Sequence, residues 1–205
     1  MRRTPVILTA LLASAAVAGV ALAQAADPAA ARIETLNAAM TQDFAKVGAQ
    51  DMAGRARLLQ PAISDAFDMP TIARLSVGPA WAALTADQQA SLTEAILRLS
   101  VATAAHNFEA YDGKRLVVDP KVDSNGVDKL VRSQIISAKG KATDVIYRMR
   151  QDAAGQWKVI DIFYNGKISE VAVRRADFSA TLGKGGAPAL LAQIDAQSAK
   201  LLTTG

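Results

Sequence analysis

Residues 157–178 read WKVIDIFYNGKISEVAVRRADF, and the arrangement of the rest of the chain can be inferred outward from them. In its first part, 157–164, both alternating sets of side chains are largely apolar, so neither face of the expected strand suits open water. A strand of this kind is typical of the middle of a sheet that is packed on both sides. Asn165-Gly166 then ends the strand, and Ser169 is placed to cap a helix that begins near Glu170.

The chain before this strand changes from a helical period to a strand period. Apolar residues recur at helical spacing over about 28–111, and the capping box of Thr85 and Gln88 begins the longest predicted helix. From about 115 to 165, apolar residues alternate with a period of two, and only short turn segments separate the alternating stretches. This pattern predicts four antiparallel strands. Residues 120–128 are rich in turn formers and predict a loop between the first two strands.

Two further helices are predicted after the sheet, over about 169–202. The glycine-rich residues 183–186 separate them, and Pro188 opens the second. The fold class is therefore α+β: a four-stranded twisted antiparallel sheet with a long helix across it and additional helices at both ends of the chain. Ala-rich helices have few large side chains to fill the space above an apolar sheet, so we expect a cavity between the two layers.

Composition excludes several classes of function. Of the 205 residues, 51% are apolar and only 5% aromatic, which favours helices over an all-β fold. The chain has no cysteine, which excludes disulfides, thiol catalysis and cysteine-bound metal clusters. The net charge of +4 includes Arg2 and Arg3, so the chain without its N-terminus is nearly neutral and we expect no nucleic-acid partner.

The N-terminus predicts export. Arg2-Arg3 precede an uncharged apolar run over 6–22, and the small residues within 21–25 fit two overlapping cleavage sites. We therefore expect residues 1–25 to be a cleaved signal peptide, with an uncleaved membrane anchor as the alternative. Residues 26–205 are then expected to form a single exported α+β domain.

The chain lacks the usual motifs of catalysis and of cofactor binding. His106 is the only histidine, and no residues have metal-ligand spacing or form a phosphate-binding glycine loop. We therefore expect no enzyme activity, no metal and no cofactor. Asp161 is the exception that needs an explanation, because it lies in an apolar strand. It is either a general base in an apolar pocket or the buried partner of an arginine such as Arg148 or Arg174.

Several short motifs, in a fixed order, resemble those of one known family. They are FDMPTIAR at 67–74, GPAW at 78–81, YDGK at 111–114, YRMR at 147–150 and NGKISEVAVRRADF at 165–178. Their order is similar to that of the MlaC / toluene-tolerance family of periplasmic, phospholipid-binding auxiliary proteins of ABC transporters, over about residues 30–200. The last motif is most similar to the hopanoid-associated HpnM branch.

The resemblance implies an NTF2-like cone and a soluble periplasmic lipid carrier. Such a carrier holds acyl or hopanoid chains in its cavity and shuttles lipid between inner- and outer-membrane complexes. The expected partners are therefore phospholipid or hopanoid lipid and these lipid-transport complexes. Two alternatives remain from the residues alone: an NTF2-like enzyme with Asp161 as general base, and a ligand-free adaptor of an envelope transporter.

The cavity of such a carrier would be lined by large apolar side chains of the helices and of one sheet face. The residues predicted to line it are Phe67, Ile72, Leu75, Trp81, Leu92, Ile96, Leu99, Phe108, Val145, Tyr147, Ile160, Ile162 and Tyr164. Arg174 is a candidate contact for a lipid head group, because a guanidinium suits phosphate. A purely structural role on the helix face is the alternative.

Overall fold

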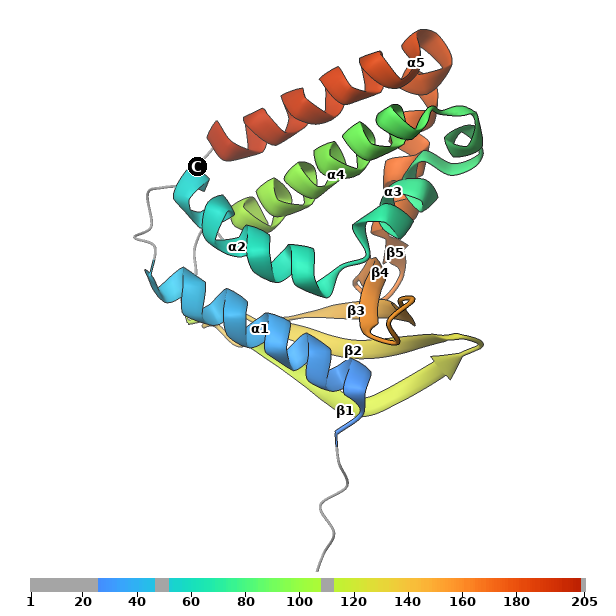
Figure 1. Cartoon of the computed structure of the whole chain (residues 1–205). Helices are drawn as coiled ribbons and strands as arrows, with labels where there is room; N and C mark the ends of the chain where they lie inside the picture. The colour runs from blue at the N-terminus through green and yellow to red at the C-terminus, as the bar shows by residue number, and fades with distance from the viewer. Residues whose placement is uncertain (1–25, 47–51, 108–112, 204–205) are drawn as a thin grey trace, which may run out of the picture.

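The computed structural model describes residues 26–46, 52–107 and 113–203 (Figure 1). Its elements in chain order are α1 (Pro28–Lys46), α2 (Met52–Ala66), α3 (Met69–Val77), the 3₁₀ helix η1 (Gly78–Ala83), α4 (Ala86–Asn107), β1 (Arg115–Asn125), β2 (Asp128–Ile136), β3 (Ala142–Gln151), β4 (Trp157–Tyr164), β5 (Ile168–Ser169) and α5 (Glu170–Thr203). None of the helices in these ranges combines the length and the apolar character needed to span a membrane. The predicted signal peptide, residues 1–25, lies outside the described residues.

The helices lie on one side of the sheet (Figure 1). α1 rests on β1, β2 and β4, while α4 packs on α2, α3 and α5. The predicted α+β fold, with an antiparallel sheet between helical segments, is confirmed. The helix closest to the sheet is α1 and not the long helix α4. The chain meets the sheet just after α2, where Phe67 bridges Val159 of β4, and α3 and η1 then separate that point from the start of α4 (Figure 1).

The sheet has strand order β1-β2-β3-β4-β5, with every neighbouring pair antiparallel. The prediction of four strands was short by one. Asn165 and Gly166 both have positive φ angles, 51° and 68°, as a tight hairpin turn requires. The turn brings Ser169 opposite Phe163 and Ile168 opposite Tyr164, which makes the two-residue strand β5.

The predicted loop over 120–128 was wrong, because β1 continues to Asn125. The pairing of β1 with β2 shifts between Val118 and Val122, so Pro120 falls in an irregularity of an edge strand. Proline is tolerated there because it need not donate a ladder hydrogen bond. The first turn-forming residues of this segment therefore indicated a bulge, and only Asn125-Gly126 marks the end of the strand.

β4 also contains a bulge, which changes the faces predicted for its side chains. Arg148 lies opposite Asp161, but the next residue, Met149, lies opposite Val159, so Ile160 is the extra residue. A bulge reverses the alternation of side chains beyond it. Val159 before the bulge and Ile162 after it consequently pack into the same apolar cluster.

Local signals for the helix ends are accurate. The backbone N–H of Thr85 donates to Oε1 of Gln88 (3.0 Å) and that of Gln88 to Oγ1 of Thr85 (3.2 Å), which confirms the capping box. The hydroxyl oxygen of Ser169 accepts from the N–H of Ala172 at 3.0 Å at the start of α5. Within the predicted break over 183–186, Gly186 is the residue with non-helical angles, φ 63° and ψ −161°.

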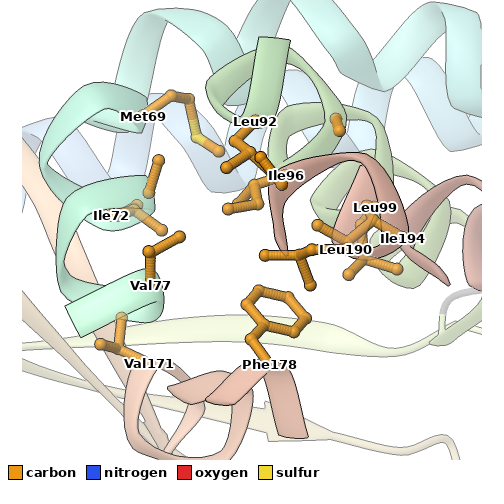
Figure 2. Packing of buried hydrophobic residues seen from close by; sticks show 13 residues of the cluster. Met69, Ile72, Val77, Leu92, Ile96, Leu99, Val171, Phe178, Leu190 and Ile194 are labelled. Carbon is orange, nitrogen blue, oxygen red and sulfur yellow. The ribbon is translucent and has the colours of Figure 1, made fainter. Parts of the chain in front are cut away.

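The helical half of the molecule has its own core between α3, α4 and α5 (Figure 2). Leu92 and Ile96 of α4 face Met69 and Ile72 of α3, and the ring of Phe178 lies beside Leu190 (Figure 2). The side chains of Leu92, Ile96 and Phe178 are essentially without solvent exposure. This core fixes α3, α4 and α5 relative to one another and leaves most of the space beside the sheet to α1.

Candidate functional site

A hollow with a volume of about 90 Å³ lies between the sheet and the helices. Every α-helix from α1 to α5 and every strand from β1 to β4 contributes to its wall, together with Phe67. The residues that line it are Leu36, Asn37, Met40, Ile63, Phe67, Ile72, Ser100, Thr103, Ala104, Asn107, Leu116, Ile135, Val145, Tyr147, Asp161, Ile162, Tyr164, Glu170, Val171 and Arg174. Asn107, at the end of α4, is exposed to solvent, so the hollow reaches the surface there.

The apolar part of the wall follows from strand pairing and helix periodicity. Tyr147 lies opposite Ile162 and Val145 opposite Tyr164 in the β3–β4 ladder, so these four side chains cover one patch of the sheet. On α1, apolar residues recur at three- and four-residue spacing and turn toward that patch. Nothing in this part of the wall is reactive.

The polar part of the wall is centred on Arg174, whose exposure is only 8%. Its Nε and Nη2 lie 3.2 Å from Oε1 of Glu170, one turn earlier in α5. Its Nη1 donates to the hydroxyl of Ser100 at 3.1 Å. A buried guanidinium is tolerated when a carboxylate and further acceptors surround it, and α4 and α5 supply both here.

Asp161 lies in the same wall and holds β4 to the start of α5. Its carboxylate accepts hydrogen bonds from the hydroxyl of Ser169 (2.7 Å) and from the backbone N–H of Val171 (3.2 Å) and Ile162 (2.8 Å). The predicted pairing of Asp161 with an arginine was wrong. In the described residues the two candidate arginines have other carboxylates, since Arg148 pairs with Asp128 and Arg174 with Glu170.

The two tyrosines of the wall are held neutral by their surroundings. Burial raises the pKa of the Tyr147 phenol far above its usual range. Burial also raises the pKa of Tyr164, and the negative charge of Glu170 adds to this effect. Both phenols therefore present a neutral ring and an uncharged hydroxyl to the hollow.

Only some of the predicted site residues reach the hollow. Phe67, Ile72, Val145, Tyr147, Ile162 and Tyr164 line the hollow, and so does Arg174. Leu75, Trp81, Leu92, Ile96 and Leu99 belong to the helical core of α3, α4 and α5 instead. Ile160 is fully buried but lies away from the hollow because of the β4 bulge, and Phe108 lies outside the described residues.

Sequence reasoning missed the contribution of α1 to the wall. Leu36, Asn37 and Met40 all line the hollow, and all three are buried. The apolar stripe of this helix was visible in the sequence. The signal that could have identified a site is Asn37, a polar residue between two apolar residues of a buried stripe.

The described residues include no group of three or more His, Cys, Asp or Glu that could hold a metal ion. The wall offers apolar surface and a few fixed hydrogen-bonding groups. These properties define an α+β protein with a ligand-binding hollow between its sheet and helices, suited to an apolar molecule with a polar end.

The chain belongs to the MlaC protein family, whose model matches residues 31–196. Its fold is similar to that of a phospholipid-binding protein from Ralstonia solanacearum, solved in complex with a phospholipid. The TM-score is 0.69 at 21% sequence identity, and the match covers 87% of this chain and 99% of that one. The curated proteins include no match to the chain.

Proposed function

We propose that the chain is a periplasmic lipid carrier that holds the acyl chains of a phospholipid in the hollow between its sheet and its helices. The observation that carries this proposal is the largely apolar wall of that hollow, in a chain of the MlaC family. The structural neighbour from Ralstonia solanacearum supports it, because that protein was solved with a phospholipid bound.

The energetics of lipid transfer match a site of this kind. Each methylene group left in water costs about 0.8 kcal/mol, so a two-chain lipid in water costs on the order of 20 kcal/mol. A wall that is as apolar as the bilayer core removes this free-energy cost of exposing the chains to water, and it needs no specific polar contacts to do so. A carrier must also release its lipid, so modest affinity relative to the membrane serves transfer better than tight binding.

The hollow must widen to accept a lipid. Its volume of about 90 Å³ is well below the roughly 300–1,000 Å³ of pockets that enclose small ligands. α3, α4 and α5 share a continuous core. α1 packs on the sheet through a second cluster, and a third cluster joins α1 to α2 and to Val101 and Ala105 of α4. We expect α1 and α2 to move away from the sheet while the helical core stays intact.

The residues that we propose as tail contacts are the predicted ones that line the hollow: Phe67, Ile72, Val145, Tyr147, Ile162 and Tyr164. Arg174 is the proposed head-group contact. A phosphate there would compete with Glu170 for the guanidinium, since Glu170 holds it at 3.2 Å. A hopanoid remains an alternative cargo, because an apolar wall alone does not distinguish ring systems from acyl chains.

The proposed route places this carrier between two membranes. Residues 1–25 would direct export and be removed, and residues 26–205 would form one domain that exchanges lipid with inner- and outer-membrane complexes. The enzyme alternative has little support, because the carboxylate of Asp161 already accepts three hydrogen bonds, two of which join β4 to Ser169 and to the first turn of α5. A ligand-free adaptor is disfavoured by the hollow itself.

Mass spectrometry of the organic extract of the purified mature chain tests this proposal. The expected result is a phospholipid or hopanoid that co-purifies in about equimolar amount, as a single enclosed site requires. The chain should also take lipid from vesicles after it has been stripped. An extract without lipid, together with no uptake from phospholipid or hopanoid vesicles, would overturn the carrier proposal.

A further inference from the structure

Asn37 is a polar residue without a polar partner in the wall of the hollow. Its exposure is 6%, and within the described ranges neither Oδ1 nor Nδ2 has a hydrogen-bond partner. The buried residues beside it on α1, Leu36 and Met40, are apolar and line the same hollow. The amide is thus held inside an apolar surface with both its donor and its acceptor unused.

Such a position is costly for the empty protein. A buried polar group without a partner costs about 1–3 kcal/mol of stability, and asparagine is a poor residue for the interior of a helix. The backbone of Asn37 gives no reason for an amide, because its carbonyl accepts from the hydroxyl of Thr41 at 2.8 Å whatever the side chain is. Packing would favour an aliphatic residue here.

Two polar groups of the wall on neighbouring helices, Arg174 and Thr103, differ from Asn37 because they have partners. Arg174 is bonded to Glu170 and Ser100, and the hydroxyl of Thr103 donates to the carbonyl of Leu99 at 2.8 Å. Those groups come from α4 and α5, whereas Asn37 comes from α1. The amide of Asn37 therefore offers a hydrogen-bonding point separate from the proposed head-group contact.

We infer that Asn37 selects lipids that carry a hydroxyl group on the part that lies inside the hollow. This inference rests on the proposed carrier function. A hydroxyl both donates and accepts, so it can use Oδ1 and Nδ2 together, whereas an ester carbonyl would leave Oδ1 unused. A plain hydrocarbon chain would leave both atoms desolvated without a partner, and sites of this kind reject an analogue that lacks the hydroxyl.

Competition between matched lipids tests the inference. Vesicles contain equal amounts of a distearoyl phospholipid and of analogues whose chains carry one hydroxyl at different positions, and mass spectrometry measures what the stripped chain takes up. Two hydrogen bonds predict a preference of about tenfold for at least one hydroxylated lipid. Asn37→Leu should abolish the preference and raise the thermal unfolding midpoint of the lipid-free chain. Asn37→Ala removes the amide without adding volume, and it replaces Asn37→Leu in the test if the leucine variant does not fold.

Thr41→Val is the matched control, because Thr41 lies one turn further along α1 and does not line the hollow. It should keep the preference of the wild-type chain. Equal uptake of all the lipids by the wild-type chain would overturn the inference and leave the carrier proposal standing. A preference that survives in Asn37→Leu would also overturn it. Uptake of no lipid at all would instead overturn the carrier proposal itself.

Discussion

The side chain of Asp161 shows how one residue can connect a strand to a helix. It accepts from the hydroxyl of Ser169 and from the N–H of Val171, which is an otherwise unpaired donor of the first turn of α5. The sequence could indicate that a buried carboxylate needed partners. It could not identify them, because they depend on the β4 bulge and on the turn at Asn165, which together bring β5 beside β4.

We predict that Asp161→Ala destabilises the fold by about 1–3 kcal/mol, because it leaves buried donors without an acceptor. Asp161→Asn should cost less, since its amide oxygen still accepts. Urea unfolding monitored by circular dichroism measures both changes. If the wild-type chain had an enzymatic activity, and Asp161→Asn lost that activity with its stability unchanged, the result would instead support a catalytic Asp161.

Acid sensitivity is a second residue-scale property, and it centres on Asp128. Burial of this carboxylate favours its neutral form, but hydrogen bonds and charge from Arg150 and Arg148 outweigh that effect and lower its pKa below the ordinary 3.8. The pKa of Asp65 is lowered by its hydrogen bond with Arg32, and that of Asp27 is lowered by Lys129 despite burial. A lowered pKa in the folded state stabilises the fold above the unfolded-state value, and that stability is lost as the pH falls through the folded-state value.

We therefore predict that the free energy of unfolding decreases as the pH is lowered from about 5 to about 2. Asp128→Asn should be less stable than the wild-type chain at neutral pH and should lose less stability over that interval. Urea unfolding at a series of pH values measures this difference. Parallel stability profiles for the two proteins would show that the Asp128 cluster contributes nothing to acid sensitivity.

At the scale of elements, the sequence predicted helix ends well and strand irregularities poorly. The capping box at Thr85 and the cap at Ser169 are local hydrogen-bond patterns, so a few neighbouring residues suffice to predict them. The bulges near Pro120 and at Ile160 depend on the partner strand, which lies elsewhere in the chain. The bulge in β4 turns Ile160 away from the hollow, so the prediction that Ile160 lines it was wrong.

The kink in α5 gives an element-scale prediction about two nearby glycines. Gly186 has a positive φ of 63°, whereas Gly183 is helical and an added Cβ there would meet no other atom within 4 Å. Gly186→Ala should therefore destabilise the chain by about 1–2 kcal/mol. Gly183→Ala should stabilise it by up to about 1 kcal/mol, because alanine is the better helix former.

Thermal and urea unfolding of the two variants check this prediction, with each variant serving as the control of the other. The account requires shifts of opposite sign. Stabilisation by both substitutions would mean that α5 runs straight through Gly186 and that the kink is not part of the stable fold.

At the scale of the whole molecule, the sequence was sufficient for the fold class and for the family, and insufficient for the site. The order of motifs and the change of period at about 115 follow from local sequence, and the MlaC family match over 31–196 agrees with them. The wall of the hollow depends on how layers pack. Leu92 and Ile96 on α4 have the same apolar character as Ile63 and Leu116, and packing alone assigns the first pair to the core and the second to the hollow.

Lipid is proposed to occupy this hollow, and a substitution that fills the hollow is the sharpest test of that proposal. Ala104 lines the hollow, so Ala104→Phe would place a ring in the space that a lipid tail needs. Ala83→Phe is the matched control, because Ala83 is exposed and lines a surface groove between η1 and α5. The measurement is the amount of labelled phospholipid that each stripped protein removes from vesicles, with circular dichroism to confirm the fold.

We predict that Ala104→Phe removes at least about tenfold less phospholipid than the wild-type chain, since the tail loses its apolar contacts. Ala83→Phe should match the wild-type chain. A folded Ala104→Phe variant that removes as much phospholipid as the wild-type chain would contradict the account, because the lipid would then be bound somewhere other than the hollow.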